Sequence, residues 1–355
     1  NNSLVGGAGN DTFKITTVAN GNDVIEGDIA NVNIGQRDTI DYSAINGSYW
    51  LEANLTTNIL RIMAPDGSDA DLLADIVDQD AVYNIEDIVG TANADTITGN
   101  SSINILSGAD GADDIDGAEG NDIIYGETNI NYFTNTSTTG AVSIGDVVEV
   151  GSTYYRAKVA QASVNFGTTN YASDTTNWEI YTSYGADKLN GGLGKDTIYG
   201  GLGNDIIKGG DGDDVLNGEF GDDTLYGDAG NDIINGGSGS DTVSYAGTSI
   251  GVTVDFVQKK GFVGVETDTY DSIENAVGSS FDDVFVSDLN VSNKIDGGDE
   301  AANAEINGDS ISYEAVSVSD ITLDKVIVNL STGADAQGYY DAQIYQNCLL
   351  SITDK

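Results

Sequence analysis

The chain has 355 residues, and its 58 acidic side chains against 13 basic ones give a formal net charge of −45. A surface of this charge excludes nucleic acid and anionic membranes as partners, because phosphate and lipid headgroups are themselves negative. The absence of histidine removes HExxH zinc proteases and Ser-His-Asp hydrolases, so we expect no enzyme, and the single cysteine removes an internal disulfide framework.

The chain begins with irregular units rich in glycine and aspartate, which occupy residues 1–41 and include GGAGNDTF from Gly6. The segment from Asp38 to Tyr42 (DTIDY) then opens a stretch of alternating apolar and polar residues, which is typical of β-strands. This stretch returns through Ile85 and Glu86 to a new glycine unit. We interpret residues 42–89 as a β excursion from an array of repeats.

A nine-residue repeat fills residues 90–128, with units that open at Gly90, Gly99, Gly108, Gly117 and Gly126. We number the nine places of each unit from its first glycine. The sixth place holds, in turn, Asp95, Asn104, Asp113 and Asp122. The amide oxygen of Asn104 carries no charge, so we expect a weak or absent cation at that unit.

The unit that opens at Gly126 breaks off after Thr128, and the six residues from Gly185 complete it. Residues 129–184 are therefore an insertion into one turn of a continuous array, and loop-closure entropy grows slowly enough to allow it. The insertion reads as a small antiparallel β module. Its aromatic residues are similar to those of small chitin- and cellulose-binding modules, a resemblance that implies glycan stacking by Tyr154, Tyr155 and Trp178. The alternative is that these aromatic side chains form the core of the module.

Residues 185–244 continue the array, and from Gly191 to Ser244 the repeat runs six times without interruption, as GGLGKDTIY, GGLGNDIIK, GGDGDDVLN, GEFGDDTLY, GDAGNDIIN and GGSGSDTVS. The sixth place is always aspartate: Asp196, Asp205, Asp214, Asp223, Asp232 and Asp241. The eighth place is always aliphatic, so every unit offers one side chain to a core.

The rest of the chain repeats the earlier pattern. A second β excursion over residues 245–277 returns through Ile273 and Glu274 to degenerate units over residues 278–312, and a truncated third excursion covers residues 313–355. Since repeats reach both ends, we expect the chain to be a piece of a longer protein.

A carboxylate that returns at a fixed pitch in a glycine-rich turn places oxygen ligands in a column, and hard cations such as Ca²⁺ prefer oxygen. One unit alone buries almost nothing, so neighbouring units must stack to complete a core. On the order of ten divalent ions would cancel about twenty of the negative charges that otherwise favour disorder. The alternative, which applies chiefly to the irregular units, is that Asp and Gly simply form turns.

The repeat resembles the GGxGxDxUx nonapeptide of RTX (repeats-in-toxin) calcium-binding proteins, in particular those of bacterial surface layers and adhesins. This resemblance implies an all-β right-handed parallel β-roll with two units per turn, so that each unit stacks on the unit eighteen residues later. It also implies that each calcium ion lies between stacked units. The implied carboxylate ligands are Asp95, Asp113, Asp122, Asp187, Asp196, Asp205, Asp214, Asp223, Asp232 and Asp241. The implied carbonyl ligands are Gly111, Gly120, Gly185, Gly192, Gly194, Gly201, Gly203, Gly209, Gly210, Asp211, Gly212, Gly218, Phe220, Gly221, Gly227, Ala229, Gly236 and Ser238.

The same stacking rule carries across the insertion. It predicts that Asp113 shares an ion with Asp187 and that Asp122 shares one with Asp196, although more than sixty residues separate the members of each pair.

We expect an extracellular, secreted structural protein, a calcium-stiffened rod in a surface layer, filament or large adhesin, with copies of itself or other surface proteins as partners. It would leave the cell unfolded, in a type I-like manner, and fold where calcium is abundant. One alternative is a secretion and folding tail of a larger exported toxin or enzyme, and another is a glycan-binding adhesin that acts through residues 129–184. No apolar run approaches the roughly 18 residues of a spanning helix, so we expect no membrane insertion.

Overall fold

The computed structural model of the chain describes residues 3–18, 22–28, 37–45, 47–64, 76–127, 132–134, 139–142, 147–150, 153–158, 161–165, 176, 178–181, 185–287, 293–298 and 310–313. All regular secondary structure in these ranges is β-strand, which confirms the all-β prediction. None of this part of the chain forms a helix long and apolar enough to cross a membrane. Of the predicted third excursion, everything after Tyr313 lies outside the described residues.

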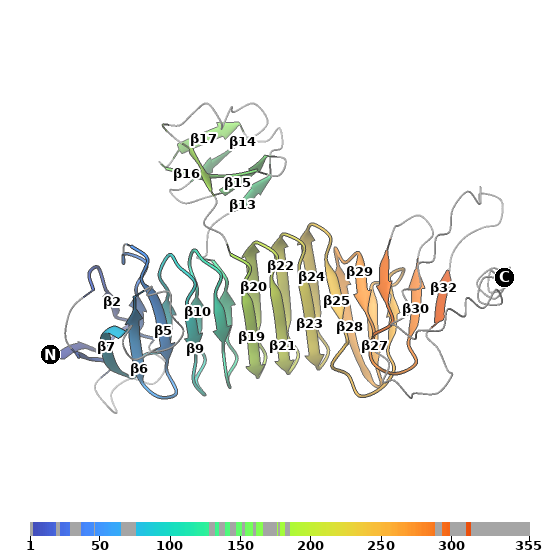
Figure 1. The fold of residues 1–355 in the computed structure, drawn as a ribbon, viewed down its shortest axis with the longest axis horizontal. Coiled ribbons are helices and arrows are strands. Elements are labelled where there is room, and N and C mark those ends of the chain that lie inside the picture. Colours follow the sequence, from blue (N-terminus) through green and yellow to red (C-terminus); the bar gives the residue numbers. More distant parts are fainter. Residues whose placement is uncertain are drawn as a thin grey trace. The chain divides into compact units, whose positions relative to one another are not determined.

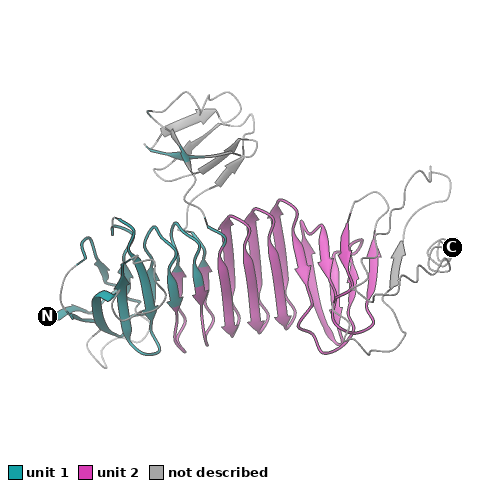
Figure 2. Ribbon diagram, viewed as in Figure 1, with its two compact units in different colours: residues 1–97, 107–114, 125–186 teal, residues 98–106, 115–124, 187–355 magenta. Residues whose placement is uncertain are grey.

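The chain divides into two compact units, coloured separately in Figure 2. Unit 1 comprises residues 1–97, 107–114 and 125–186, and unit 2 comprises residues 98–106, 115–124 and 187–355. Four strands hold residues of both units: β9 (Thr96–Thr98), β10 (Ile105–Ser107), β11 (Asp114–Asp116) and β12 (Ile123–Tyr125). Unit 1 therefore contains the insertion and the first excursion, and unit 2 contains the uninterrupted repeats and the second excursion.

Unit 2 is a parallel β-roll in which successive repeats alternate between two sheets (Figure 1). One sheet includes the order β11-β19-β21-β23-β25-β29-β31, and the other includes β10-β12-β20-β22-β24. Parallel pairing has a register of eighteen residues, as in Ile198 opposite Leu216, so two repeats make one turn as predicted. The repeat strands are β19 (Lys188–Leu193), β20 (Thr197–Leu202), β21 (Ile206–Asp211), β22 (Val215–Phe220), β23 (Thr224–Ala229), β24 (Ile233–Ser238), β25 (Thr242–Ser244), β29 (Asn275–Val277) and β31 (Lys294–Asp296).

The eighth place of each repeat forms the core of the roll. Side chains alternate between the two faces of a strand, so the residues on either side of the eighth place face away from it. Burying one aliphatic side chain contributes about 1.5–3 kcal/mol, and stacking sums this contribution along the roll. The eighth-place side chains of the uninterrupted block are all 0 % exposed: Ile198, Ile207, Leu216, Leu225, Ile234 and Val243.

The turns of the regular repeat require a left-handed backbone at two places. The fourth-place Gly194 has a φ of 143°, and a Cβ there would overlap the carbonyl oxygen of Gly120. The second place also has a positive φ, 98° at Gly192, but it is not always glycine. A side chain in this conformation costs roughly 1–2 kcal/mol, so the roll imposes the turn even where the residue disfavours it. The second-place residues other than glycine are Ala109, Ala118, Glu219 and Asp228, with φ of 81°, 74°, 73° and 63°.

The fifth-place side chains form a ladder of hydrogen bonds along the exposed side of the turns. The side-chain oxygen of Asn204 accepts the N–H of Asp222 at 2.9 Å, and that of Asp213 accepts the N–H of Asn231 at 3.0 Å. Asp222 accepts the N–H of Ser240 in the same way, at 2.9 Å. The ladder explains why Asn and Asp recur at this place, because both have the short acceptor that a turn N–H needs.

The second excursion joins the roll as antiparallel strands. The strands β26 (Thr253–Asp255), β27 (Lys260–Val263) and β28 (Glu266–Asp271) pair antiparallel with one another, and β28 pairs parallel with β24. The first strand, β26, pairs parallel with β30 (Val284–Ser287), which in turn pairs with β32 (Ser310–Tyr313). The excursion therefore extends a sheet of the roll.

Unit 1 contains the corresponding meander of the first excursion. The strands β5 (Trp50–Asn54), β6 (Ile59–Met63) and β7 (Ile76–Tyr83) are antiparallel, and β7 pairs parallel with β3. The sheets of this unit include the orders β1-β3-β7-β6-β5 and β2-β4-β8. The remaining strands are β1 (Ser3–Gly7), β2 (Thr12–Lys14), β3 (Val24–Asp28), β4 (Thr39–Asp41) and β8 (Asp87–Val89).

The insertion forms a separate small β module within unit 1. Its four-stranded sheet has the order β13-β15-β16-β18, and a second sheet pairs β14 with β17. All of these pairs are antiparallel except β13 with β15, so the module is mixed rather than purely antiparallel as predicted. The strands are β13 (Tyr132–Thr134), β14 (Thr139–Val142), β15 (Val147–Val150), β16 (Thr153–Ala157), β17 (Gln161–Asn165) and β18 (Trp178–Tyr181).

The left-handed second place gives a test of the turn geometry. We expect Ala118→Gly to stabilise unit 2 by about 0.5–1 kcal/mol, because glycine relieves the strain of a φ of 74°. The matched control is Ala112→Gly, an exposed alanine of the preceding turn that is not among the described residues with positive φ. In urea unfolding the control should lose stability, because glycine adds entropy to the unfolded chain without relieving strain. If Ala118→Gly loses stability as well, Ala118 is not strained in the folded chain.

Candidate metal centres

The sixth-place aspartates of unit 2 stack in two columns held by one repeated hydrogen bond. In each case the backbone N–H of one aspartate donates to Oδ1 of the aspartate one turn later. In the first column the distances are 2.6 Å for Asp122 to Asp196, 2.8 Å for Asp196 to Asp214 and 2.9 Å for Asp214 to Asp232. In the second column they are 2.8 Å for Asp187 to Asp205, 2.8 Å for Asp205 to Asp223 and 2.9 Å for Asp223 to Asp241. One carboxylate oxygen of each residue is therefore committed to the fold.

The second carboxylate oxygen is buried without a protein donor. Among the described residues, no hydrogen-bond donor reaches Oδ2 of the six aspartates of the uninterrupted block, and each of these residues is at most 1 % exposed. An ionised oxygen in such a place is strongly disfavoured unless a cation or a proton neutralises it. The columns therefore require a counter-charge. The six residues are Asp196, Asp205, Asp214, Asp223, Asp232 and Asp241.

The first-place glycines lie close against these oxygens. A Cβ on Gly200 would lie 2.5 Å from Oδ2 of Asp205 and 2.7 Å from the carbonyl oxygen of Gly218, one turn later. Because a side chain of any kind would clash there, only glycine lets the carboxylate and the carbonyl of the next turn come together. The same convergence of a carboxylate and a carbonyl occurs at Gly191, Gly209 and Gly218.

The third-place carbonyls supply further oxygens. The carbonyl of Asp211 accepts the N–H of Gly194 at 2.9 Å, and that of Phe220 accepts the N–H of Gly203 at 2.9 Å. A carbonyl oxygen has two lone pairs, so one stays available after this bond. The carbonyls of Ala229 and Ser238 are bonded in the same way, to Gly212 and Gly221.

This donor set fits calcium. It consists of carboxylate and carbonyl oxygens without nitrogen or sulfur, and Ca²⁺ takes six to eight such oxygens. Among the described residues, no three acidic, histidine or cysteine side chains gather into one cluster. Backbone oxygens would therefore provide most of the ligands, which explains why the repeat depends on glycine.

Burial raises the pKa of the column aspartates. The pKa rises to about 7 for Asp205 and about 8 for Asp223, chiefly because burial penalises the charged form. It rises to about 6 for Asp214 and Asp241 for the same reason, and the neighbouring Asp196 adds repulsion at Asp214. A cation between the carboxylates would act in the opposite direction.

The structure brings Asp122 and Asp196 together across the insertion, as the eighteen-residue rule predicts. Besides the bond between the two aspartates, the N–H of Thr197 donates to the carbonyl of Asp122 at 2.9 Å. In unit 1, Gly185 lies against Gly111, because a Cβ on Gly185 would overlap the Gly111 carbonyl. The pairing of Asp113 with Asp187 joins residues of the two units and stays a prediction.

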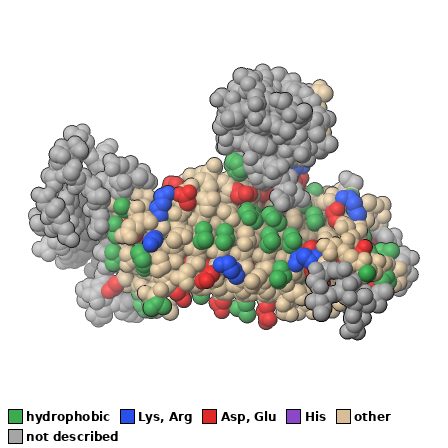
Figure 3. Space-filling model, turned by 180° about the vertical axis from the view of Figure 1, so that it is seen from behind, with side chains coloured by type: hydrophobic (Ala, Val, Ile, Leu, Met, Phe, Trp, Pro, Cys, Tyr) green, Lys and Arg blue, Asp and Glu red, His purple; other side chains and the backbone are tan. Residues whose placement is uncertain are grey.

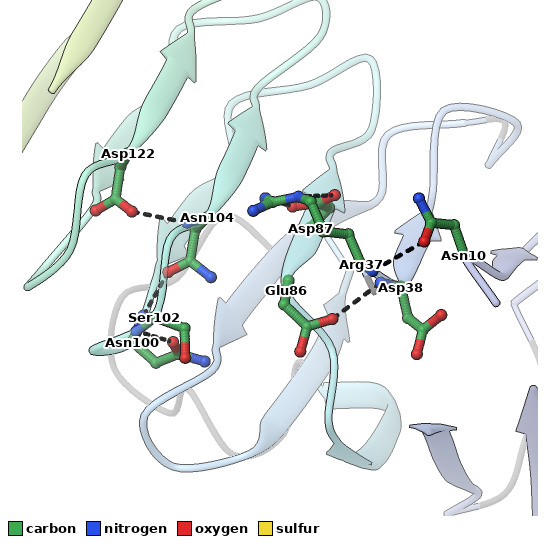
Figure 4. Close-up of polar contacts among 9 residues, drawn as sticks. All are labelled: Asn10, Arg37, Asp38, Glu86, Asp87, Asn100, Ser102, Asn104 and Asp122. Carbon is green, nitrogen blue, oxygen red and sulfur yellow. Dashed lines mark hydrogen bonds and ion pairs between the residues drawn. The ribbon is translucent and has the colours of Figure 1, made fainter. Parts of the chain in front are cut away.

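Three acidic residues that were not among the predicted ligands take the position of a sixth-place aspartate in a column. The N–H of Asp241 donates to Glu274 Oε2 at 3.0 Å, and in unit 1 the N–H of Asp38 donates to Glu86 Oε2 at 2.9 Å (Figure 4). The recurrence of Ile-Glu at the end of both excursions was the available signal. Asp268 takes this role after Asp232, at 3.0 Å.

The column that contains Asp232 ends at Asp268, whose carboxylate accepts a hydrogen bond from a tyrosine hydroxyl. Oδ2 of Asp268 accepts the hydroxyl of Tyr245 at 2.7 Å, and the hydroxyls of Tyr245 and Tyr270 lie 2.9 Å apart. Asp268 therefore has a donor at the oxygen that the regular repeats leave open.

The three aromatic residues predicted for glycan stacking lie in β16 and β18 of the insertion. Tyr155 is only 8 % exposed, so its ring belongs to the interior of the module, as in the core interpretation. The side chains of Tyr154 and Trp178 lie outside the described residues. The neighbouring Arg156 forms an ion pair with Asp110 of the repeat array at 2.5 Å, within unit 1.

The raised pKa values predict opposite pH dependences with and without calcium. Without calcium, the folded state binds protons more tightly than the unfolded chain, so stability is greatest near pH 4 and falls as pH rises towards about 8. With saturating calcium, protons compete with the ion, so stability should rise over the same range. The folded fraction from circular dichroism, followed from about pH 5 to about pH 8 in chelator and in calcium, measures both slopes. Equal slopes would contradict the role of the carboxylates.

Asp214→Asn tests a column position against a matched neighbour. In calcium we expect a loss of about 3 kcal/mol, because Asp214 faces carboxylates on both sides and its charge would be missing from two candidate sites. Asp213→Asn makes the same change at an exposed residue and should stay within about 0.5 kcal/mol. In chelator, Asp214→Asn should be at least as stable as the parent chain, since it removes a buried charge. A loss that is the same in both media would show that Asp214 acts only in packing.

Comparison with known proteins agrees with this geometry. The family model of the RTX calcium-binding nonapeptide repeat matches the chain in four copies, over residues 1–14, 88–127, 179–207 and 208–243. These segments contain the aspartate columns described above. A search of curated proteins found no match. The chain therefore contains RTX calcium-binding nonapeptide repeats, and its repeats wind into a parallel β-roll.

Proposed function

We propose that this chain is an extracellular structural protein, a roll that calcium folds and stiffens and that serves in a surface layer, a filament or a large adhesin. The observation that carries the proposal is the set of six buried aspartates of the uninterrupted block, with one oxygen of each carboxylate bound to the backbone and the other without a donor among the described residues. Its role is mechanical support, without a catalytic step.

Repulsion within the columns couples folding to calcium. Asp214 lies one turn from both Asp196 and Asp232, so without a counter-charge each added turn brings another buried like charge into the column. Calcium bound between the turns would neutralise and cross-link these carboxylates. At extracellular calcium near 10⁻³ M, sites with a Kd of about 10⁻⁴ to 10⁻³ M are occupied, and binding free energy becomes folding free energy. In a cell interior with little calcium, the same chain stays unfolded and fit for export.

The placement of charge suits a scaffold. The column aspartates are buried, so they do not contribute to the surface of the folded roll. On the face drawn in Figure 3, basic and acidic side chains lie scattered among neutral and apolar ones. A folded roll of this kind presents a mixed surface that can meet neighbouring molecules.

The accessory strands favour a scaffold over a folding tail. The second excursion adds three strands to a sheet of the roll, and the insertion adds a β module held to the repeats by Arg156 and Asp110. A segment that only needs to fold after export has no use for this additional surface. We assign no glycan-binding role to the insertion, because the ring of Tyr155 is buried.

Removal of calcium tests the coupling. We expect excess chelator to abolish most of the β signal in circular dichroism and to restore it when calcium returns, whereas magnesium at the same concentration should not, because Mg²⁺ is smaller and dehydrates reluctantly. A roll that keeps its signal in chelator at neutral pH would overturn the proposal. Electron microscopy of the calcium-loaded chain at high concentration addresses the structural role, for which ordered arrays or filaments are the expected result.

A further inference from the structure

The unit that follows each excursion differs from the regular repeat at its second place. These units open as GTANAD at Gly90 and as GSSFDD at Gly278, with a hydroxyl residue instead of the usual second-place glycine. Thr91 donates its N–H to Oδ2 of Asp95 at 2.5 Å and its hydroxyl to Oδ1 at 2.8 Å. The N–H of Leu51 also donates to Oδ1, at 2.7 Å. Both oxygens of Asp95 are therefore satisfied by the protein.

The unit at Gly278 repeats this arrangement atom for atom. Ser279 donates its N–H to Oδ2 of Asp283 at 2.7 Å and its hydroxyl to Oδ1 at 2.8 Å. The N–H of Val252 donates to the same Oδ1 at 2.7 Å. Two units almost two hundred residues apart thus use the same three donors on the sixth-place aspartate.

The unit at Gly99 has a related arrangement without a hydroxyl. The N–H of Asn100 donates to Oδ1 of Asn104 at 2.8 Å (Figure 4). Asn104 still donates its own N–H to Oδ1 of Asp122 at 2.7 Å, so this unit belongs to the column although its side chain is neutral.

The backbone at the second place separates these three units from the regular ones. In the regular units this residue has a positive φ, including the non-glycine residues Ala109, Ala118, Glu219 and Asp228. Thr91, Asn100 and Ser279 are not among the described residues with positive φ. A β-branched residue such as Thr91 resists that conformation, and with the other backbone conformation the second-place N–H points at the sixth-place side chain.

We propose that the units opening at Gly90, Gly99 and Gly278 bind no calcium, and that the second-place residue decides this. The inference rests on the proposed calcium binding of the regular units. It removes Asp95 from the set of ligands that the repeat pattern predicts.

The oxygens beside Gly90 are otherwise arranged as in the regular units. A Cβ on Gly90 would clash with Oδ2 of Asp95 and the carbonyl of Gly108, the same two kinds of oxygen that converge at Gly200. The difference is the N–H of Thr91, which donates to Oδ2. Its positive partial charge opposes a cation, and the carboxylate no longer needs one.

The hydroxyl residues therefore act as caps on the calcium columns. In both units the second-place residue satisfies the carboxylate oxygen that a regular unit leaves open. Thr91 and Ser279 stand in the first unit after an excursion, where a run of repeats begins. Their donors replace the missing ion by hydrogen bonds.

Counting bound ions by native mass spectrometry of the calcium-loaded chain tests this assignment. We expect Asp95→Asn to retain the same number of calcium ions as the parent chain, whereas the matched Asp205→Asn loses at least one. Thr91→Gly, which removes the hydroxyl and permits a positive φ, should gain one ion. Ser279→Gly and Asp283→Asn repeat the test at the second unit, should a variant of the first fail to show the full β signal in circular dichroism.

The outcomes separate the two proposals. A parent chain that binds no calcium would overturn the proposed function itself. A parent chain that binds calcium and loses an ion on Asp95→Asn would overturn only the assignment of capped units. Unchanged counts in Asp95→Asn together with no gain in Thr91→Gly would overturn the role of the second-place residue.

Discussion

The whole roll depends on one hydrogen bond repeated at every turn, from the backbone N–H of one aspartate to Oδ1 of the aspartate stacked on it. In unit 2 this bond recurs from Asp122 to Asp241 at 2.6–2.9 Å. It fixes the rotamer of each carboxylate, and so it fixes the position of the second oxygen. The aliphatic eighth place fills the interior of the roll, and the first-place glycines let the backbone lie close to that oxygen. The same hydrogen bond thereby sets where a cation would bind.

The chain satisfies its buried carboxylates in two different ways. In the regular repeats the second oxygen has no protein donor among the described residues and calls for a counter-charge. At Asp95, Asp283 and Asp268 it accepts a bond from Thr91, Ser279 or Tyr245 instead. Under the proposed calcium binding, the first kind would make stability depend on the ion and the second would not. The balance between them sets how much of the roll responds to the ion.

The nine-residue period was sufficient to predict the columns and the eighth-place core. The stacking of Asp122 on Asp196 was predicted from the two units per turn that the RTX resemblance implies, applied to the unit that the insertion splits. The period could not identify Glu86 or Glu274, because each follows an irregular excursion and stands where the repeat has aspartate. It also placed Asp95 among the ligands, because spacing shows which residues stack but not where a backbone N–H points. That direction depends on φ at the second place, which a sequence pattern does not encode directly.

The insertion leaves and re-enters the repeat array within one unit, which has a practical use in protein engineering. Glu127, before the insertion, accepts the Ser107 hydroxyl at its carbonyl, and Gly185, after it, rests on the carbonyl of Gly111. Both ends of the module are thus anchored in the same set of turns, and a foreign domain with neighbouring termini could take its place. Such a chimera would carry a passenger on a scaffold whose assembly an experimenter switches with a simple salt.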